Sequence, residues 1–454
     1  MSLKSINPAS GKVLATFEPY NDAYIAAAVE LSEKAFYTHR QTGIQDRAEK
    51  MRAVAALLES HKERHALTIT REMGKTLASA RAEVEKCALG CRFYADNAAR
   101  FLEDQFIKME GAEAFVRYLP LGPLLAIMPW NFPYWQVFRF AAPAIMAGNT
   151  VLLKHASNVP QCALAIEDVF REAGLGEGVF QILLIGSDQV GQLIDDSRVR
   201  GVTLTGSEGA GRAVASRAAL NIKKTVLELG GSDAFIVMPS ADIDHAVSCA
   251  VTGRIQNAGQ SCIAAKRFII HSSVYEVFRE KMIAAFESLK VGDPEEEGVD
   301  LGPLSSAQAV DDLEALVEQS IEAGAVRVCG AKRIEGEGFF FRPGLLEDIP
   351  REAPAYSEEL FGPVGLLFAV GDLDDAVLLA NDTRFGLGSA IFTTDQDEME
   401  RAINGLEAGA TFVNKVVASD PRLPFGGVKA SGYGRELAEE GIREFMNIKT
   451  VVSA

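Results

Sequence analysis

The sequence predicts an α/β protein with three parts: a doubly wound parallel-sheet domain, a second α/β domain and a small β flap. Between 123 and 229, short and continuously apolar runs alternate with helical segments, as in parallel sheets that are covered on both faces. The same alternation starts again after Ser232. A chain of 454 residues has room for two or three domains with sizeable cores.

The first hundred residues are expected to be mostly helical. A turn at 7–12 precedes segments from about 22 to 106 whose apolar residues recur at helical spacing. One of these helices should end at Gly74, because glycine readily takes the left-handed conformation that closes a helix. Residues 113–119 alternate between apolar and polar side chains, which is typical of a half-buried strand.

A regular β/α series follows, and it predicts the doubly wound sheet. Ligands bind such sheets at the carboxyl ends of the strands, so Lys154, Gly206 and Glu228 should lie near one another. The first expected strand is the apolar run that starts at 123, and the other strands cover 150–154, 179–185, 200–205 and 225–229. The expected helices cover 134–147, 159–173, 188–195 and 206–220.

The second series is expected to form the other α/β domain. Its strands are predicted at 234–238 and 267–271, with helices at 242–256, 274–289 and 311–323. The chain ends in an exposed-looking strand, which could pair with a partner subunit.

Composition excludes several classes of protein. A formal net charge of −17 argues against nucleic acid or an anionic membrane as a partner. The six cysteines are too scattered for a disulfide framework, and Cys87 and Cys91 have no further ligands that would make a metal site. The N-terminus has no apolar leader, and no segment is long and apolar enough to span a membrane. We therefore expect a cytoplasmic protein without a metal.

Two motifs carry candidate chemistry. The run T-V-L-E-L-G-G ends a strand at Glu228, and N-A-G-Q-S-C places Cys262 in a turn before the next strand. A thiol can form a covalent intermediate, and a carboxylate can activate water to release it. The glycine-rich turn 206–211 follows a strand and opens a helix, where backbone N–H groups could hold a pyrophosphate.

Together these motifs resemble the NAD(P)-dependent aldehyde dehydrogenase superfamily, and within it most closely the short bacterial succinate semialdehyde dehydrogenases. The resemblance extends over P-W-N-F-P (129–133), V-L-L-K (151–154), E-L-F-G-P (359–363) and P-F-G-G-V-K-A-S-G (424–432), in the family's order. It implies a dinucleotide-binding domain at 1–106 and 123–229, a catalytic domain at 230–432, and oligomerisation segments at 107–122 and 433–454.

The resemblance also implies a mechanism. Cys262 would attack the aldehyde, the Asn131 amide and the Cys262 N–H would bind the oxyanion, and Glu228 would activate the water that hydrolyses the thioester. Because acylating relatives lack this glutamate, the product should be a free acid. The cofactor-binding residues implied are Ile127, Pro129, Trp130, Lys154, Ser157, Gly206, Ser207, Gly211, Leu229, Gly230, Glu359 and Phe361.

The cofactor is expected to be NADP or NAD, with NADP favoured. NAD-preferring relatives carry a glutamate where this chain has Ser157. Lys154 together with a neutral hydroxyl can accept a 2′-phosphate that a carboxylate would repel.

Substrate choice is interpreted from the same family. Arg139 and Ser419 match the residues that grip the carboxylate of succinate semialdehyde, and Phe132 and Phe425 would line the pocket. A second arginine of that site is replaced here by Gln256. We therefore expect a short carboxylated aldehyde.

Two alternatives remain open: a dehydrogenase for glutarate semialdehyde or a simple aliphatic aldehyde, and a non-catalytic cofactor-binding protein with a structural role. The expected partners are the small aldehyde substrate and further copies of this chain, as a homodimer or homotetramer.

Overall fold

The first body of the molecule is built on a six-stranded sheet. The computed structural model describes residues 2–453, and in it the strand order is β19-β9-β8-β5-β6-β7, with all pairs parallel except β19 against β9. The order reverses between β5 and β8, so this sheet is doubly wound as predicted. Its strands are β5 Pro123–Met128, β6 Thr150–His155, β7 Phe180–Ile182, β8 Gly201–Thr205, β9 Lys224–Glu228 and β19 Gly432–Tyr433.

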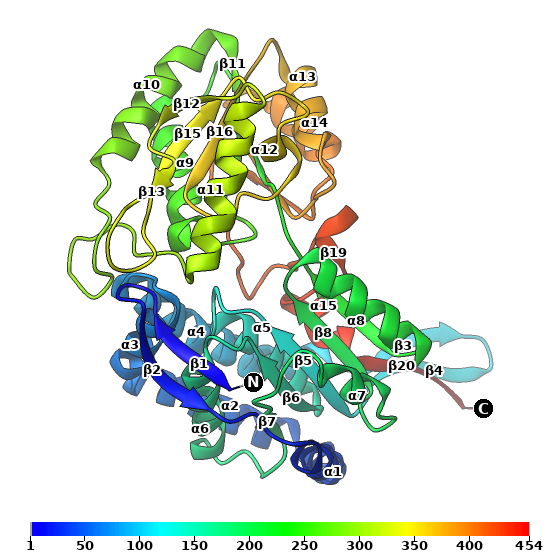
Figure 1. The fold of residues 1–454 in the computed structure, drawn as a ribbon. Helices are drawn as coiled ribbons and strands as arrows, with labels where there is room; N and C mark the ends of the chain where they lie inside the picture. Colours follow the sequence, from blue (N-terminus) through cyan, green and yellow to red (C-terminus); the bar gives the residue numbers. More distant parts are fainter. Residues whose placement is uncertain (1, 454) are drawn as a thin grey trace.

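Helices cover this sheet, which occupies the lower half of Figure 1. Helix α5 (Trp135–Ala147) is buried along its whole length, because it is apolar on every side and is covered by α4 and α2. Helix α3 ends at Gly74, whose φ of 91° closes it as expected. The remaining elements are β1 Leu3–Asn7, β2 Lys12–Phe17, α1 Asp22–His39, α2 Ile44–Ser60, α3 Lys62–Met73, α4 Leu77–Phe101, α6 Pro160–Glu172, α7 Val190–Asp195, α8 Glu208–Leu220 and α15 Ala438–Glu444.

The second body has a seven-stranded sheet of order β12-β15-β16-β11-β10-β17-β18, parallel except for β12. It fills the upper half of Figure 1. Its strands are β10 Ala234–Val237, β11 Arg267–His271, β12 Val326–Cys329, β15 Gly344–Glu347, β16 Val364–Val370, β17 Gly388–Phe392 and β18 Ala410–Val413. Its helices are α9 Ile243–Ile255, η1 Gln256–Gly259, α10 Ser272–Ser288, α11 Ala307–Glu322, α12 Pro354–Ser357, α13 Leu373–Asn381, α14 Gln396–Gly405 and η2 Lys429–Ser431, and a small ribbon pairs β13 Lys332–Arg333 with β14 Phe341–Arg342.

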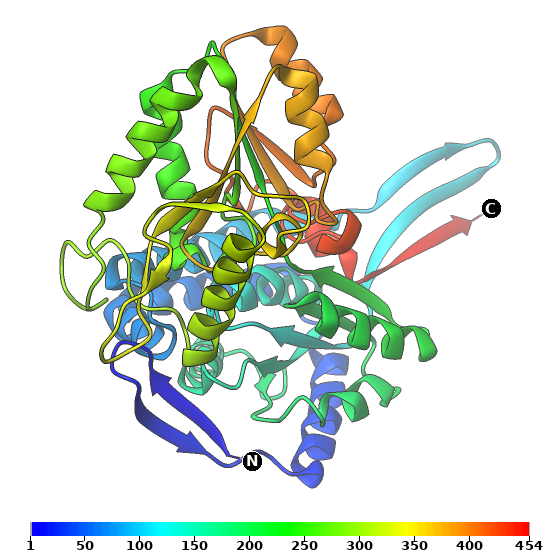
Figure 2. The same ribbon diagram turned by 45° about the horizontal axis from the view of Figure 1, so that its top comes forward.

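A three-stranded flap of order β20-β4-β3 projects from the first body, as Figure 2 shows. Its strands are β3 Gln105–Met109, β4 Ala112–Pro120 and β20 Met446–Ser453. Residues 433–445 do not join it: β19 pairs with β9, and α15 packs on α5 and α4. In the structure the C-terminal part of the flap therefore begins at Met446.

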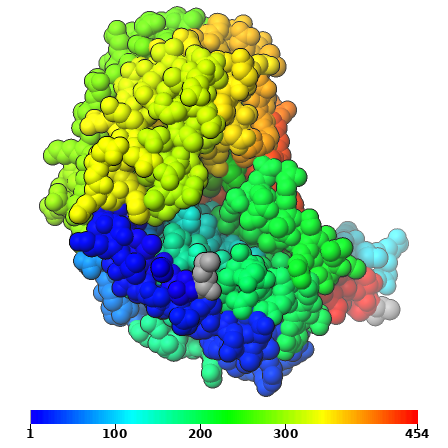
Figure 3. All heavy atoms as spheres, viewed as in Figure 1, coloured from blue at the N-terminus to red at the C-terminus, as the bar shows by residue number. Residues whose placement is uncertain are grey.

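The two bodies meet around a hollow that is visible in the space-filling view (Figure 3). Links across the junction include the Leu77 N–H, which donates to the Pro294 carbonyl at 2.8 Å, and the Arg71–Glu295 ion pair at 2.8 Å. Within residues 2–453, no helix is long and apolar enough to cross a membrane.

Candidate active site

The carboxyl ends of the first body's strands converge at the hollow. Pro129 follows β5, Lys154 lies at the end of β6, Gly206 follows β8 and Glu228 ends β9. The Gly206 N–H donates to the Glu228 carbonyl at 2.9 Å, so the turn into α8 and the end of β9 are tied together. This is the edge at which a doubly wound sheet binds its ligand.

Cys262 is presented by a loop with an unusual backbone. Asn257, Ala258 and Gly259 have φ values of 56°, 53° and 74°, so the chain reverses sharply just before the cysteine. Only glycine fits at 259, since an added Cβ would lie 2.3 Å from the Gly362 carbonyl carbon. Strain of this kind persists only where neighbouring groups fix the loop.

Lys266 supplies much of that fixation. Its buried Nζ donates to the carbonyls of Ser261 (3.0 Å) and Cys262 (2.9 Å) and forms an ion pair with Glu359 at 3.2 Å. Arg254, also buried, donates to the Gly259 carbonyl at 2.7 Å. One lysine therefore connects the cysteine loop to the E-L-F-G-P segment.

Asn131 lies against this loop. Its Nδ2 donates one hydrogen to the Gln260 carbonyl at 3.0 Å, and the Asn257 amide donates to the Asn131 carbonyl at 2.7 Å. An amide nitrogen has two hydrogens, so one remains for a ligand. Asn131 and Cys262 both line a cavity of about 320 Å³.

The Cys262 thiol is strongly protonated in this environment. Burial raises its pKa to about 12, against the opposing effect of the Arg139 charge. Since the thiolate is the nucleophilic form, Cys262 needs a base or a bound ligand to activate it.

Glu228 is a carboxylate without hydrogen-bond partners. It is 1% exposed, and neither carboxylate oxygen has a partner among the described residues. Burial raises its pKa to about 8, and the nearby Arg139 acts in the opposite direction. A side chain at 426 would crowd it, because a Cβ there would lie 2.9 Å from Glu228 Oε1. Such a group can take and release protons near neutral pH.

Arg139 faces inward on α5. It forms a buried ion pair with Glu436, its Nη2 lies 3.3 Å from Thr205 Oγ1, and its guanidinium lies 4.7 Å from the centre of the Phe425 ring. The expectation that Arg139 binds a substrate carboxylate stays a prediction, and in the structure its charge is already matched by Glu436.

The other expected substrate residues lie on the same side of α5. The Ser419 hydroxyl lies 2.7 Å from Lys86 Nζ and 3.0 Å from Trp135 Nε1. Phe132 is held by Lys75, whose ammonium lies 3.9 Å from the ring centre. Phe425 stacks under Arg139 as described above.

A second cavity, of about 650 Å³, adjoins the first, and the two share Trp130, Glu359 and Phe361. The rings of Trp130 and Phe361 meet edge to face at 5.8 Å between their centres. Together the cavities form a trough that leads from Lys154 and Ser157 past Glu359 to Cys262.

The trough fits a dinucleotide. Ser207 caps α8 by accepting a hydrogen bond from the Ala210 N–H at 3.3 Å, and Gly206 and Ser207 line the first cavity. The N-terminus of α8 therefore opens into this cavity, and a helix N-terminus favours an anionic group such as phosphate. Glycine at 211 and 230 leaves room for Leu229 and Glu359, because a Cβ would lie 2.7 Å from Leu229 Cδ2 and 2.5 Å from Glu359 Oε2, respectively. Ile127 lies under this region at the end of β5.

The far end of the trough carries unmatched positive charge. No carboxylate among residues 2–453 lies within 4 Å of Lys154 Nζ, and burial lowers the pKa of this lysine. Ser157 lines the same cavity and is exposed. Asp312 and Glu359 line this cavity as well, but neither carboxylate lies within 4 Å of Lys154 Nζ, so the ammonium and the hydroxyl still fit an anionic ligand at this position.

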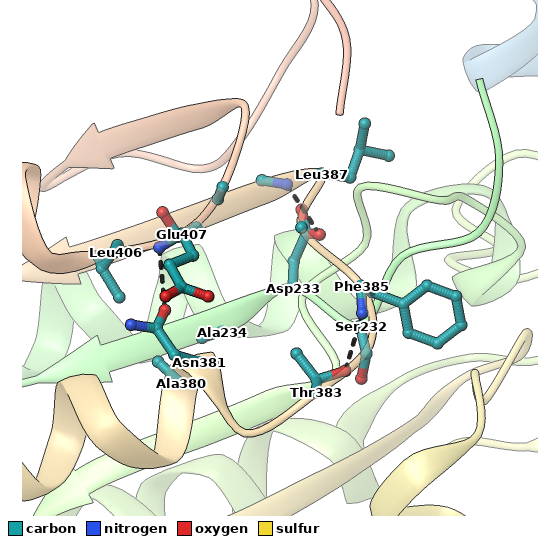
Figure 4. Close-up of a pocket in the computed structure, with 14 residues that line it drawn as sticks. Ser232, Asp233, Ala234, Ala380, Asn381, Thr383, Phe385, Leu387, Leu406 and Glu407 are labelled. Carbon is teal, nitrogen blue, oxygen red and sulfur yellow. Dashed lines mark hydrogen bonds between the residues drawn. The ribbon is translucent and has the colours of Figure 1, made fainter. Parts of the chain in front are cut away.

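A small separate cavity of about 20 Å³ lies in the second body, between Asp233 and Asn381 (Figure 4). The Asp233 carboxylate accepts a hydrogen bond from the Gly388 N–H at 3.0 Å on one side of it, and Asn381 accepts one from the Glu407 N–H at 2.9 Å on the other. The space holds about one water molecule, so this cavity is structural rather than a substrate site.

The sequence alone did not point to three charged residues of this site: Lys86, Lys266 and Glu436. Lys266 follows the N-A-G-Q-S-C motif four residues after Cys262, whereas Lys86 and Glu436 lie on ordinary helical or loop segments with no local signal. Cys87 and Cys91 are buried in α4, and residues 2–453 contain no group of acidic, histidine or cysteine side chains that could hold a metal.

Comparisons with known proteins agree with this geometry. The model of the aldehyde dehydrogenase family matches residues 1–451. A probable NADP(+) succinate-semialdehyde dehydrogenase from Synechocystis is 51% identical over 99% of both chains, and succinate-semialdehyde dehydrogenase [NADP(+)] 1 from Mycobacterium tuberculosis is also 51% identical over 99% of both. The crystal structure of succinic semialdehyde dehydrogenase from Streptococcus pyogenes with NADP+ has a TM-score of 0.97 at 38% identity, covering 99% of both chains.

Proposed function

This chain belongs to the aldehyde dehydrogenase family, and we propose that it oxidises a short ω-carboxylated aldehyde, succinate semialdehyde, to succinate with NADP+. The observation that supports this most directly is the pair of joined cavities. One end holds the thiol of Cys262, and the other offers Lys154 and Ser157 to an anionic group. The relatives with matching names span the whole chain.

In the proposed mechanism Cys262 loses its proton to water, and its sulfur bonds to the aldehyde carbon while the carbonyl double bond opens to leave an oxyanion. The second hydrogen of the Asn131 amide and the Cys262 N–H stabilise the resulting oxyanion. The bound nicotinamide supplies the acceptor for the hydride that leaves this carbon. What remains on Cys262 is a thioester.

Glu228 then acts as a general base. Its carboxylate takes a proton from water, and the hydroxide oxygen bonds to the thioester carbon while the Cys262 sulfur leaves. A pKa of about 8 suits this role, because the group can accept the proton and give it up again near neutral pH. The products are the free acid and the restored thiol.

We propose that Phe132 and Phe425 line the path of the substrate and that Ser419 meets its carboxylate end. The role proposed for Ser419 rests on the position of its hydroxyl, which accepts a hydrogen bond from Trp135 Nε1 at the start of α5. Arg139 acts at longer range, because its guanidinium is already paired with Glu436.

The two bodies have different proposed roles. We propose that the first body holds the cofactor and that the second supplies the nucleophile. The flap has exposed strand edges and apolar side chains, with Phe106 77% and Ile448 61% exposed, which suits pairing with further copies as a homodimer or homotetramer. Light scattering at several concentrations measures that assembly.

Because all six cysteines are free thiols, we also propose a reducing, cytoplasmic location.

The deciding experiment is a panel of aldehydes with and without a terminal carboxylate, assayed with NADP+ and with NAD+. The expected result is the highest kcat/KM for succinate semialdehyde with NADP+. A higher value for glutarate semialdehyde or for butanal would reassign the substrate, and absence of any NADPH burst with all aldehydes would refute the enzymatic role.

A further inference from the structure

Helix α4 is locked to the start of α5 by a buried charged pair. The Glu83 carboxylate accepts hydrogen bonds from the N–H groups of Tyr134 (2.8 Å) and Trp135 (3.0 Å), which begin α5. Lys75, fully buried, forms an ion pair with Glu83 and matches its charge. The position of the next turn of α4 relative to α5 is therefore well defined.

Lys86 lies on that next turn and carries an unmatched charge. Its Nζ lies 4.4 Å from the centre of the Trp135 ring, and no carboxylate among the described residues lies within 4 Å of it. Glu83 and Asp420 attract it only from farther away, and they are themselves paired with Lys75 and with Arg422 (2.6 Å), respectively. Burial, reinforced by the charge of Arg139, lowers the pKa of Lys86 to about 8, as expected for a cation without a counter-ion.

Two hydrogen-bond donors converge on one hydroxyl oxygen here. Lys86 Nζ donates to Ser419 Oγ at 2.7 Å, and Trp135 Nε1 donates to the same oxygen at 3.0 Å. A hydroxyl has two lone pairs and one hydrogen, so two incoming donors leave its own hydrogen to be donated. The cluster of Lys86, Trp135 and Ser419 thus offers a positive charge and spare hydrogens, which fits an anionic acceptor.

This cluster lies beside the proposed reaction centre. Ser419 lines a narrow cavity with Phe425 and with Ile263, the residue that follows Cys262. Trp135 belongs to the same helix start that follows Asn131. If the carbonyl of a short aldehyde lies at Cys262, this cavity is where its other end would fit.

We infer that Lys86, together with Ser419 and Trp135, binds the terminal carboxylate of the substrate and sets the preference for ω-carboxylated aldehydes. This inference rests on the proposed function and adds the residue that supplies the charge. Arg139 cannot supply it as directly, because Glu436 occupies its guanidinium.

The test compares Lys86→Met, which keeps the length of the side chain without its charge, with Lys86→Arg. Succinate semialdehyde and butanal are assayed with each variant. For Lys86→Met, kcat/KM should fall by roughly 10- to 150-fold for succinate semialdehyde, mostly through KM, and by less than about threefold for butanal. Lys86→Arg should recover most of the loss. Arg92→Met, an exposed change on the same helix, is the matched control.

Binding of succinate, measured by calorimetry, provides a readout without turnover and should weaken in parallel. Unchanged NADP+ affinity in Lys86→Met shows that the variant is folded. If wild type fails to prefer succinate semialdehyde over butanal, the proposed function fails. If wild type shows the preference and Lys86→Met keeps it, or loses both substrates equally, the inference about Lys86 alone is overturned.

Discussion

Replacing Glu228 by glutamine tests the mechanism most sharply. Glutamine keeps the size of the side chain but cannot take a proton from water. The Glu228 carboxylate is buried without partners, and its pKa lies at about 8. The ionised form is therefore the minority at neutral pH, with about one molecule in ten ionised at pH 7 and one in a hundred at pH 6.

Two quantities follow from that pKa. Because the base form predominates above about pH 8 and is lost below it, wild-type kcat should rise about tenfold from pH 6 to 7 and about fivefold from pH 7 to 8 where thioester hydrolysis limits turnover. Glu228→Gln should lower steady-state turnover by roughly 10²- to 10⁴-fold and show little of this pH dependence. The first turnover should survive, since Cys262 still forms the thioester.

Stopped-flow measurement of NADPH formation separates the two phases. The expected record for Glu228→Gln is a burst approaching one NADPH per active site, followed by almost no turnover. Glu318→Gln, an exposed change on α11, serves as the control. Loss of the burst while NADP+ still binds, or a wild-type kcat that is flat between pH 6 and 8, would contradict the assigned role.

Three further predictions follow. Cys262→Ala should abolish turnover and leave NADP+ affinity unchanged by calorimetry, and near-normal activity would exclude the covalent mechanism. Ser157→Glu should weaken NADP+ binding by at least about tenfold. A tenfold loss of affinity corresponds to roughly 1.4 kcal/mol, and the repulsion between a carboxylate and the 2′-phosphate costs more than that. An unchanged ratio of the KM values for NADP+ and NAD+ would show that position 157 does not contact the ribose. Arg139→Leu leaves the Glu436 carboxylate buried without its partner, so the free energy of unfolding should fall by roughly 3–5 kcal/mol in urea titrations. Adding Glu436→Gln should restore part of that loss, and a single variant as stable as wild type would refute the argument.

The sequence by itself determined the architecture and pointed to the candidate reacting groups. Alternating apolar and helical segments follow from local periodicity, and the doubly wound sheet that they predict is confirmed. Strand ends and glycine turns then place Glu228 and Gly206 at one edge, since parallel strands end at the same edge of a sheet. The family resemblance, carried by short local motifs, is confirmed by the family match over residues 1–451.

Only the tertiary structure decided how charges are paired. Lys86 and Ser419 are separated by 333 positions and meet because the second body closes over α4 and α5. Arg139 meets Glu436 because the segment between β19 and α15 returns to the first body and packs on α5, and Lys86 is left without a counter-ion. A single sequence contains no local signal for such pairs, because each joins segments that are far apart in the chain. The pKa values of Glu228 and Cys262 depend on the same packing, since burial is their largest cause.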